Sequence, residues 1–273
     1  MDMGLGNKTA LVTGSTKGIG RAIAFELARE GVHILVNGRD PEEVERTVRE
    51  LKQEFPATSP QNASADLVDP QQRNALLERY PEVDILINNM GIYEIMSYED
   101  VNDEVWETYI RTNVLAANAL TKFYLSKMLK NNFGRILFMA SEEAVMPSGQ
   151  MPQYAMTKSM LLSLSKSLSK LTAGTDVTSN TIMPGPTLSE KVQRIIEQLY
   201  PEDLAFAEKE KKFMAANLAH SELQRFIRPF ESADWLFSYA APMPRHLEAP
   251  RSAWTEVWYL RSFNEKRGCP QSP

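Results

Sequence analysis

The feature that most constrains the fold is a regular alternation of strand-like and helix-like segments along the chain. Short apolar runs without polar alternation predict strands that are covered on both faces of a sheet. These runs lie at 9–13, 32–36, 83–88, 135–140 and 177–183. Helical patterns lie between them, at 20–30, 41–54, 70–79, 104–131 and 153–171. Alternating strands and helices indicate right-handed crossovers, so we expect a single α/β domain with a doubly wound parallel sheet in three layers, α/β/α.

A glycine-rich turn lies between the first of these strands and the first helix. It contains Gly14, Gly18 and Gly20, with Lys17 among them. Glycine permits the tight turn and lets the backbone approach a ligand, while the following helix offers free N–H groups and a positive dipole end. Such a turn is typical of a Rossmann-like fold that binds phosphate. The spacing Gly-x-x-x-Gly-x-Gly departs from the usual dinucleotide fingerprint, so by itself the turn also fits a purely structural role.

Composition narrows the class of protein. The chain has 273 residues and a net charge of −5, which argues against nucleic acid or an anionic membrane as the main partner. Its apolar runs are shorter than a membrane span needs, and residues 1–9 lack the zones of a signal peptide. The single cysteine, Cys269, leaves no disulfide framework. We expect a cytoplasmic protein, and we assign no metal ligands.

Further motifs follow the later strands and give the glycine turn a context. They are Asn88-Asn89-Met90-Gly91, Asn113 in the long helix, Ser141, Tyr154-Ala155-Met156-Thr157-Lys158, and Pro184-Gly185-Pro186-Thr187. In combination they strongly resemble the short-chain dehydrogenase/reductase family, over roughly residues 8–229. Met90 is a departure, because the family usually has alanine there, and we expect a modest repacking beside the cofactor.

The expected chemistry centres on Tyr154 and Lys158. They are four residues apart, so they share one helix face. A neighbouring ammonium is expected to lower the pKa of the phenol, and the pair can then exchange a proton with a substrate oxygen while hydride moves at the adjacent carbon. The resemblance implies that Ser141 hydrogen-bonds the substrate carbonyl and that Asn113 holds a water in a proton relay through Lys158. Without these partners, a Tyr/Lys pair would more often be a solvated helix face.

The residues after the second strand predict the cofactor. The strand ends at Asn37, where NAD enzymes place an acid for the ribose 2′-hydroxyl, whereas Lys17 and Arg39 can converge on a 2′-phosphate. We therefore predict a preference for NADP(H), with NAD(H) as the alternative. Asp40 argues for NAD(H), unless it caps the helix that begins at Pro41.

The resemblance extends the predicted cofactor site along the chain. Asp66 corresponds to the family's adenine-contacting acid, although it could also be a plain turn residue. The residues that we predict to bind the cofactor are Gly14, Ser15, Lys17, Gly18, Ile19, Gly20, Arg39, Asp66, Leu67, Asn89, Gly91, Tyr154, Lys158, Pro184, Gly185 and Thr187.

Two further regions bear on which substrate binds and on how subunits assemble. Segment 188–225 is a longer insertion than the fold requires, and we interpret it as two short helices, broken at Tyr200-Pro201, that form a lid. A surface helical hairpin is the alternative. The leucine stripe of helix 153–171 predicts core packing. The resemblance implies that this helix and the preceding one also form a subunit interface, so we expect a homo-oligomer, a dimer or a tetramer.

The tail, residues 235–273, lacks the family's closing strand and Asp-Gly-Gly pattern. Pro242, Pro244 and Pro250 cannot donate to a ladder, so we expect little strand there and an unpaired edge at 177–183. When the codons are read one base out of frame, those of Trp254-Thr255 necessarily encode Asp and those of Trp258-Tyr259 necessarily encode Val. Both residues match the pattern that is missing. We hypothesise a one-base frameshift near Asp234–Trp235, with residues 1–234 as the catalytic domain.

Two classes of function fit these features. The first is an NADP(H)-dependent oxidoreductase (EC 1.1.1.-) that interconverts a small-molecule carbonyl and a secondary alcohol, like either a 3-oxoacyl-carrier-protein reductase or a sugar or polyol dehydrogenase. The second is a nucleotide-binding regulatory or inactive family member with an impaired C-terminus. The presence of Ser141, Tyr154 and Lys158 favours the enzyme.

Overall fold

The computed structural model describes residues 4–218, 221, 223–233 and 258–259. Its sheet has seven parallel strands in the order β3-β2-β1-β4-β5-β6-β7. The strands are β1 (Thr9–Val12), β2 (His33–Val36), β3 (Gln61–Asn62), β4 (Ile85–Asn88), β5 (Gly134–Met139), β6 (Val177–Met183) and β7 (Trp258–Tyr259). This order places a topological switch point between β1 and β4, where doubly wound sheets bind their ligands at the carboxyl ends of the strands.

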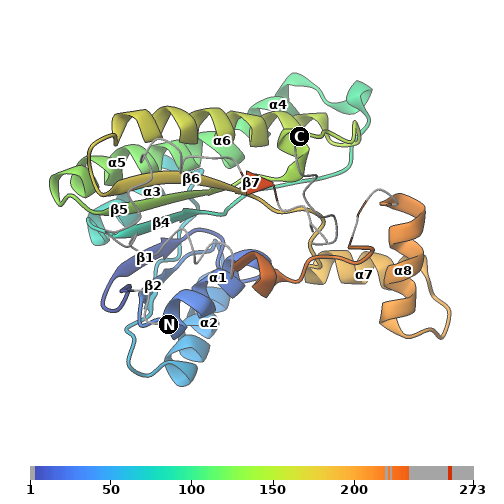
Figure 1. The fold of residues 1–273 in the computed structure, drawn as a ribbon, viewed down its shortest axis with the longest axis horizontal. Helices are drawn as coiled ribbons and strands as arrows, with labels where there is room; N and C mark the ends of the chain where they lie inside the picture. The colour runs from blue at the N-terminus through green and yellow to red at the C-terminus, as the bar shows by residue number, and fades with distance from the viewer. Residues whose placement is uncertain (1–3, 219–220, 222, 234–257, 260–273) are drawn as a thin grey trace, which may run out of the picture.

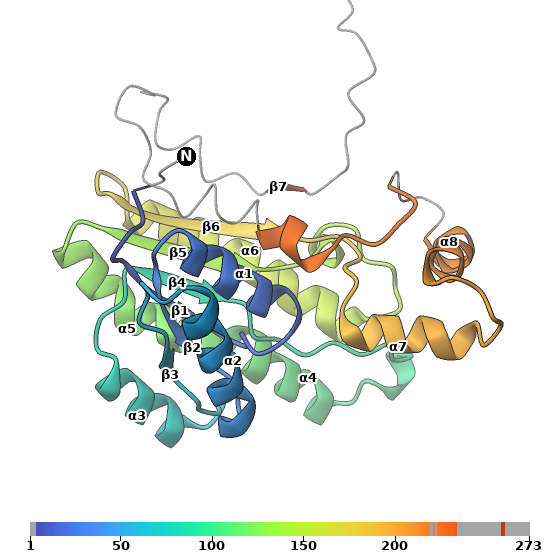
Figure 2. The same cartoon turned by 90° about the horizontal axis from the view of Figure 1, so that it is seen from below.

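Helices cover both faces of the sheet (Figures 1 and 2). They are α1 (Gly18–Arg29), α2 (Pro41–Glu54), α3 (Pro70–Arg79), α4 (Asp103–Ile110), α5 (Ala116–Lys130), α6 (Pro152–Leu171), α7 (Glu190–Leu199) and α8 (Phe206–Asn217). Successive strand residues point to opposite faces. In β1, Ala10 and Val12 therefore pack in one apolar cluster with α1 and α2, while Leu11 packs in the other with α3, α5 and α6. The predicted three-layer fold is confirmed.

The predicted strands and helices are all present, with two differences. β3 was not predicted, because its two residues are polar and form no apolar run. The helix expected over 104–131 is divided into α4, a π-helical turn at η2 (Arg111–Leu115) and α5. Isolated π-helical turns within α-helices occur frequently at functional sites.

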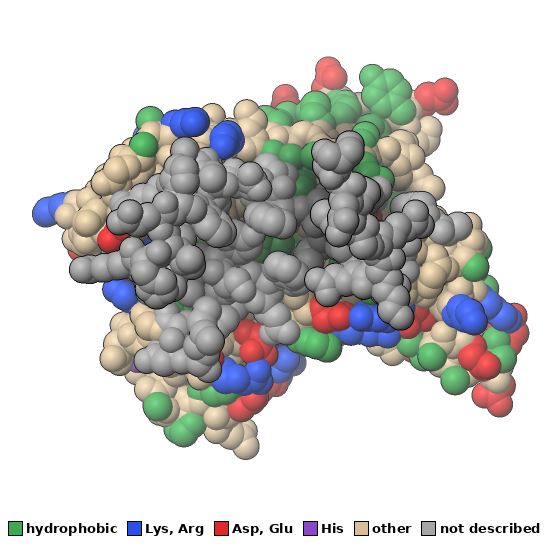
Figure 3. Space-filling model, in the orientation of Figure 1, with side chains coloured by type: hydrophobic (Ala, Val, Ile, Leu, Met, Phe, Trp, Pro, Cys, Tyr) green, Lys and Arg blue, Asp and Glu red, His purple; other side chains and the backbone are tan. Residues whose placement is uncertain are grey.

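The insertion consists of two short helices, α7 and α8, as the sequence predicts, and Tyr200 ends the first of them. They project to one side of the sheet (Figure 1) and share a small apolar core with the residues that follow them. Ile196, Met214 and Phe226 are its buried members. Figure 3 shows charged side chains of both signs over this projecting part, and Lys212 and Glu202 pair there at 3.7 Å.

The expectation that β6 would lack a partner is wrong for its last two residues. Ile182 and Met183 pair in parallel with Trp258 and Tyr259 of β7. These two residues follow Pro242, Pro244 and Pro250, and neither is a proline, so both retain the backbone N–H that a ladder needs. The rest of the predicted tail, including the frameshift positions, lies outside the described residues, and the frameshift stays a hypothesis. In the part of the chain described, no helix is long and apolar enough to cross a membrane.

Candidate active site

The glycine turn leads from β1 into α1 and leaves no room for a side chain at Gly20. Gly14 and Gly18 adopt positive φ angles of 63° and 57°, a region that glycine occupies at low cost. A Cβ on Gly20 would lie 2.4 Å from both Asn89 Nδ2 and the carbonyl oxygen of Gly14. Lys17, the N-cap residue of α1, makes no side-chain capping bond. The first turn therefore offers N–H groups and a close backbone surface, as a phosphate site requires.

The end of β4 holds this turn in place. Asn89 Nδ2 donates to the carbonyl oxygens of Thr13 and Gly14, at 2.9 and 3.1 Å. The Thr13 hydroxyl accepts the backbone N–H groups of Asn89 and Met90, both at 2.9 Å, and donates to Ile87 O. Asn89 thus holds the predicted cofactor turn in place, and Thr13, which no sequence motif predicted for this site, joins the ends of β1 and β4.

A second set of bonds ties the turn to β2. Ser15 is fully buried, its backbone N–H donates to Asn37 O at 2.8 Å, and its hydroxyl accepts from Asn37 N at 3.0 Å. The Asn37 amide donates to the carbonyls of Ala63 and Ala65. Both the backbone N–H and the hydroxyl of Ser15 are thus hydrogen-bonded to Asn37. This neutral residue occupies the position where an NAD enzyme places its acid.

The two predicted phosphate-binding cations differ in their surroundings. Lys17 Nζ lies 2.6 Å from a carboxylate oxygen of Glu43 on α2, a contact that the sequence did not predict. Arg39 is exposed and makes no ion pair with another described residue. Asp40 caps α2, because its carboxylate accepts the N–H groups at the start of that helix. This capping removes the main argument for NAD(H), while convergence of the two cations stays a prediction.

At the adenine end, both predicted residues have structural contacts. The Asp66 carboxylate accepts the N–H of Val68 at 3.0 Å, which is the turn role that we considered as an alternative. The Leu67 side chain is fully buried, and its carbonyl accepts from Arg73 at 2.9 Å. Their contact with a nucleotide stays a prediction.

The catalytic candidates meet at the carboxyl end of β5. Ser141 follows this strand and caps a short turn, η3 (Glu142–Ala144). Tyr154 and Lys158 come from the first turns of α6, and Lys158 Nζ lies 5.4 Å from the centre of the Tyr154 ring. Lys158 Nζ donates to the carbonyl of Met139 at 2.6 Å, and Ser141 hydrogen-bonds Tyr154. The structure therefore brings the predicted serine, tyrosine and lysine together.

Burial dominates the acidity of this group. It raises the pKa of Tyr154 to about 12, opposed by the hydrogen bond from Ser141. It also lowers the pKa of Lys158 to about 8. The net lowering of the Tyr154 pKa that the sequence predicts is not found, because desolvation raises this pKa by more than the hydrogen bond from Ser141 lowers it. At neutral pH the phenol is a proton donor.

Asn113 lies in the π-helical turn η2 and is fully enclosed. Its Oδ1 accepts the N–H of Ile92 at 2.8 Å, and its Nδ2 donates to Ile92 O and to the Thr157 hydroxyl. A Cβ on Gly91 would lie 3.3 Å from Asn113 Oδ1 and 3.4 Å from Lys158 Nζ. Gly91, Asn113 and Lys158 are therefore neighbours, as the predicted relay requires.

The loop 184–187 closes the site from β6. Pro184 O accepts the N–H of Glu142 at 3.1 Å, and the Thr187 hydroxyl donates to Gly185 O. Ile227 exchanges backbone bonds with Pro186 O and Leu188 N, at 2.8 Å each. The predicted cofactor loop is thus anchored to the catalytic serine segment on one side and to the chain beyond α8 on the other.

Three residues at the site were not predicted. The Tyr93 ring lies 6.1 Å from that of Tyr154, and Lys191 Nζ of α7 lies 4.6 Å from the Tyr93 ring centre. Glu142 carries a carboxyl group against Gly185. In the sequence, only the position of Glu142, directly after Ser141, could have indicated its place.

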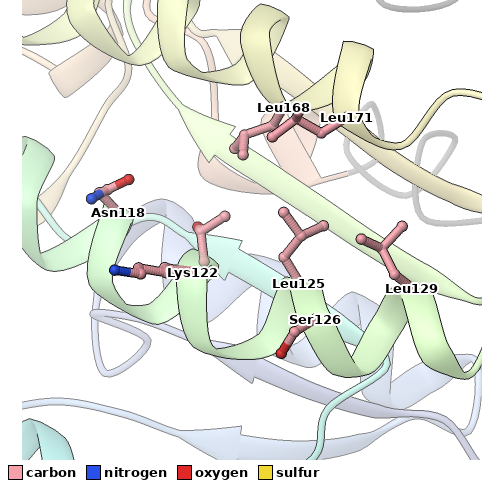
Figure 4. A pocket seen from close by; sticks show the side chains of 8 residues that line it. Asn118, Lys122, Leu125, Ser126, Leu129, Leu168 and Leu171 are labelled. Carbon is pink, nitrogen blue, oxygen red and sulfur yellow. The ribbon is translucent and has the colours of Figure 1, made fainter.

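A shallow hollow of about 300 Å³ lies elsewhere, between α5 and α6 (Figure 4). Its lining residues are Asn118, Thr121, Lys122, Leu125, Ser126, Leu129, Leu168 and Leu171. None of them is a predicted site residue. The leucine stripe of α6 is divided: Leu161 and Leu168 are buried, as predicted for core packing, whereas Leu171 is 66% exposed. The exposed part is on the helix pair expected to form a subunit interface.

Comparison with known proteins agrees with this geometry. A family model described as short chain dehydrogenase matches residues 8–199. The chain is 45% identical over 244 residues to the uncharacterized oxidoreductase YvaG of Bacillus subtilis, covering 89% of this chain and 92% of that protein. It is 32% identical over 187 residues to the 3-oxoacyl-[acyl-carrier-protein] reductase FabG of Escherichia coli, covering 67% and 75%.

A solved structure agrees in fold as well. The L-sorbose reductase of Gluconobacter frateurii, complexed with NADPH and L-sorbose, superposes with a TM-score of 0.82 at 28% identity, covering 93% of this chain and 94% of that one. The chain therefore belongs to the short-chain dehydrogenase/reductase family, a family of oxidoreductases.

Proposed function

We propose that this protein is an NADP(H)-dependent oxidoreductase that interconverts a small-molecule carbonyl and a secondary alcohol. The observation that carries the proposal is the convergence of Ser141, Tyr154 and Lys158 at the end of β5, with Asn113 and Gly91 beside the lysine. A proton donor, its hydrogen-bonding partner and a buried ammonium group are the parts that carbonyl reduction needs beside a hydride source.

The residues of the glycine turn fit a dinucleotide. At Gly20 the turn packs directly against Asn89 and the Gly14 carbonyl, and the first turn of α1 supplies N–H donors for a phosphate. When bound, the nicotinamide supplies or accepts the hydride. Exposed Arg39 and nearby Lys17 would hold the 2′-phosphate, for which Lys17 has to exchange its contact with Glu43. The complex of L-sorbose reductase with NADPH supports this preference.

The protein's own groups have distinct roles in this proposal. Tyr154, whose pKa stands at about 12, donates its phenolic proton to the carbonyl oxygen. Ser141 hydrogen-bonds that oxygen and orients it. Along the predicted relay, the ammonium of Lys158 returns a proton to the phenolate left behind, and Asn113 positions the water that reprotonates the lysine. Since the phenol is protonated at neutral pH, it can serve as the proton donor when a ketone is reduced.

One observation favours a second candidate, a nucleotide-binding member without turnover. Residues 235–273 lack the closing pattern of the family, whereas the nucleotide turn is intact. To distinguish the two candidates, NADPH consumption by the purified protein is measured with a panel of ketones, aldehydes and 3-oxoacyl thioesters. The enzyme consumes NADPH with at least one of them, and more slowly consumes NADH. Tight NADPH binding without consumption would contradict the proposed activity and support the second candidate.

We also propose that the protein forms a homo-oligomer through α5 and α6. The exposed Leu171 and the apolar hollow beside it support this interface. Light scattering of the wild type and of Leu171→Glu tests it, because a buried charge at an interface is costly. The variant is expected to shift toward smaller species, and an unchanged mass for both would contradict this interface.

A further inference from the structure

Glu142 lies between the two segments that meet at the proposed reaction site. It follows Ser141 directly, and its backbone N–H is fixed to Pro184 O at 3.1 Å. Its carboxylate oxygen Oε2 lies 3.4 Å from the position of a Cβ on Gly185. The side chain therefore points along the cofactor loop, within the electrostatic reach of Tyr154.

The Glu142 carboxyl group has no protein partner that explains its position. Among the described residues it makes no hydrogen bond and no ion pair, although the side chain is half-buried. Its neighbour Glu143 differs, because that carboxylate accepts the backbone N–H of Ser148 at 2.9 Å. Burial and Glu143 raise the pKa of Glu142 to about 7. A half-buried carboxyl without partners costs stability, and such groups gather at functional sites.

We propose that Glu142 is a specificity residue that accepts a hydrogen bond from a substrate hydroxyl near the reacting carbonyl, so that the enzyme selects hydroxy-ketones and polyols. This inference rests on the proposed function. It divides the two substrate classes that the sequence leaves open, because a 3-oxoacyl chain has no such hydroxyl and would leave the carboxyl unsatisfied.

Charge bears on a third class of substrate, the 3-oxo acids. At a pH above the Glu142 pKa of about 7, a substrate carboxylate near the carbonyl would lie beside the charges of Glu142 and Glu143, and like charges at close range repel. A hydroxyl instead donates to the carboxylate, and a hydrogen bond to a charged group contributes about 1.5–3 kcal/mol, roughly ten- to a hundredfold in affinity. Neutral hydroxylated ketones are therefore preferred over 3-oxo acids.

The test uses matched ketones and the full-length chain. Each hydroxy-ketone is paired with the analogue that has methyl in place of the hydroxyl, for example hydroxyacetone with butanone, and acetoacetate serves as the anion. The kcat/KM values are compared for the wild type, Glu142→Gln and Glu142→Ala. Glu78→Gln, an exposed glutamate on α3, is the control. NADPH binding by fluorescence and thermal melts report whether each variant is intact.

The wild type is expected to prefer the hydroxy-ketones. Glu142→Ala loses that preference by about ten- to a hundredfold, while reduction of the methyl analogue and NADPH binding persist. Glu142→Gln raises kcat/KM for acetoacetate, because the charge is gone. A wild-type ratio at or below one, or an unchanged ratio in Glu142→Ala, overturns the inference but leaves the oxidoreductase intact. If no ketone or other carbonyl is reduced, the proposed function itself fails, and this inference with it.

Discussion

An alanine at position 20 tests the construction of the glycine turn. A Cβ on Gly20 would lie 2.4 Å from both Asn89 Nδ2 and Gly14 O, and since one neighbour is backbone, the turn has to move. Moving Asn89 breaks its bonds to Thr13 and Gly14, at about 0.5–1.5 kcal/mol each. Overpacking adds about 1–3 kcal/mol to this destabilisation, whereas the higher helix propensity of alanine reduces it by about 0.5–1 kcal/mol.

We therefore expect Gly20→Ala to lower the free energy of unfolding by about 1–5 kcal/mol and to weaken NADPH binding. Denaturant titration followed by circular dichroism measures the first, and NADPH fluorescence measures the second. Gly6→Ala is the matched control, because a Cβ there meets nothing within 4 Å. If Gly20→Ala matches the control in both measurements, the turn is not packed as described.

Other changes test single interactions. Arg39→Ala is expected to weaken NADPH binding roughly ten- to a hundredfold more than NADH binding; equal losses, with exposed Arg49→Ala as control, would make Arg39 structural. Tyr124→Phe removes a buried hydroxyl that donates to Tyr80 O at 2.8 Å, and should cost about 1 kcal/mol in unfolding free energy. A hydrogen bond from Arg225 lowers the pKa of Glu231 to about 2 from 4.5, so it stabilises the fold above pH 4.5 and this contribution is lost as pH falls toward 2. In acid titrations Glu231→Gln should therefore lose less stability than the wild type over that interval, and parallel curves would refute the pairing. A chain with the tail restored to the family frame should melt higher than the chain as given, and equal melting would show that this tail packs on its own.

Much of the fold follows from local pattern. Apolar runs predicted every long strand, and proline at the start of α2 and α3 correctly indicated where those helices begin. The two-residue β3 escaped, because it is defined by pairing with β2 and not by its own composition. The π-helical turn escaped because the helical pattern of 104–131 continues through it.

The sequence predicted which residues form the site, but it did not predict their pKa shifts or all of their contacts. The four-residue spacing predicted that Tyr154 and Lys158 share a helix face, the family resemblance implied that Ser141 joins them, and the structure brings the three together. The sequence could not show how deeply the phenol of Tyr154 is buried, so the sign of the pKa shift of Tyr154 came out wrong. Glu43, which holds Lys17, and Glu142, which lies against Gly185, are on other elements. Only folding brings Glu43 close to Lys17 and Glu142 close to Gly185.

The most direct test of the account is the turnover of Tyr154→Phe with a ketone that the wild type reduces. The change removes one hydroxyl and leaves the ring in place, so packing and NADPH binding are expected to persist. Loss of the proton donor should reduce kcat by at least the roughly hundredfold typical of general acid catalysis. If Tyr154→Phe, with NADPH bound as in the wild type, reduces the ketone at a similar rate, then Tyr154 is not the proton donor and the assignment of this site is wrong.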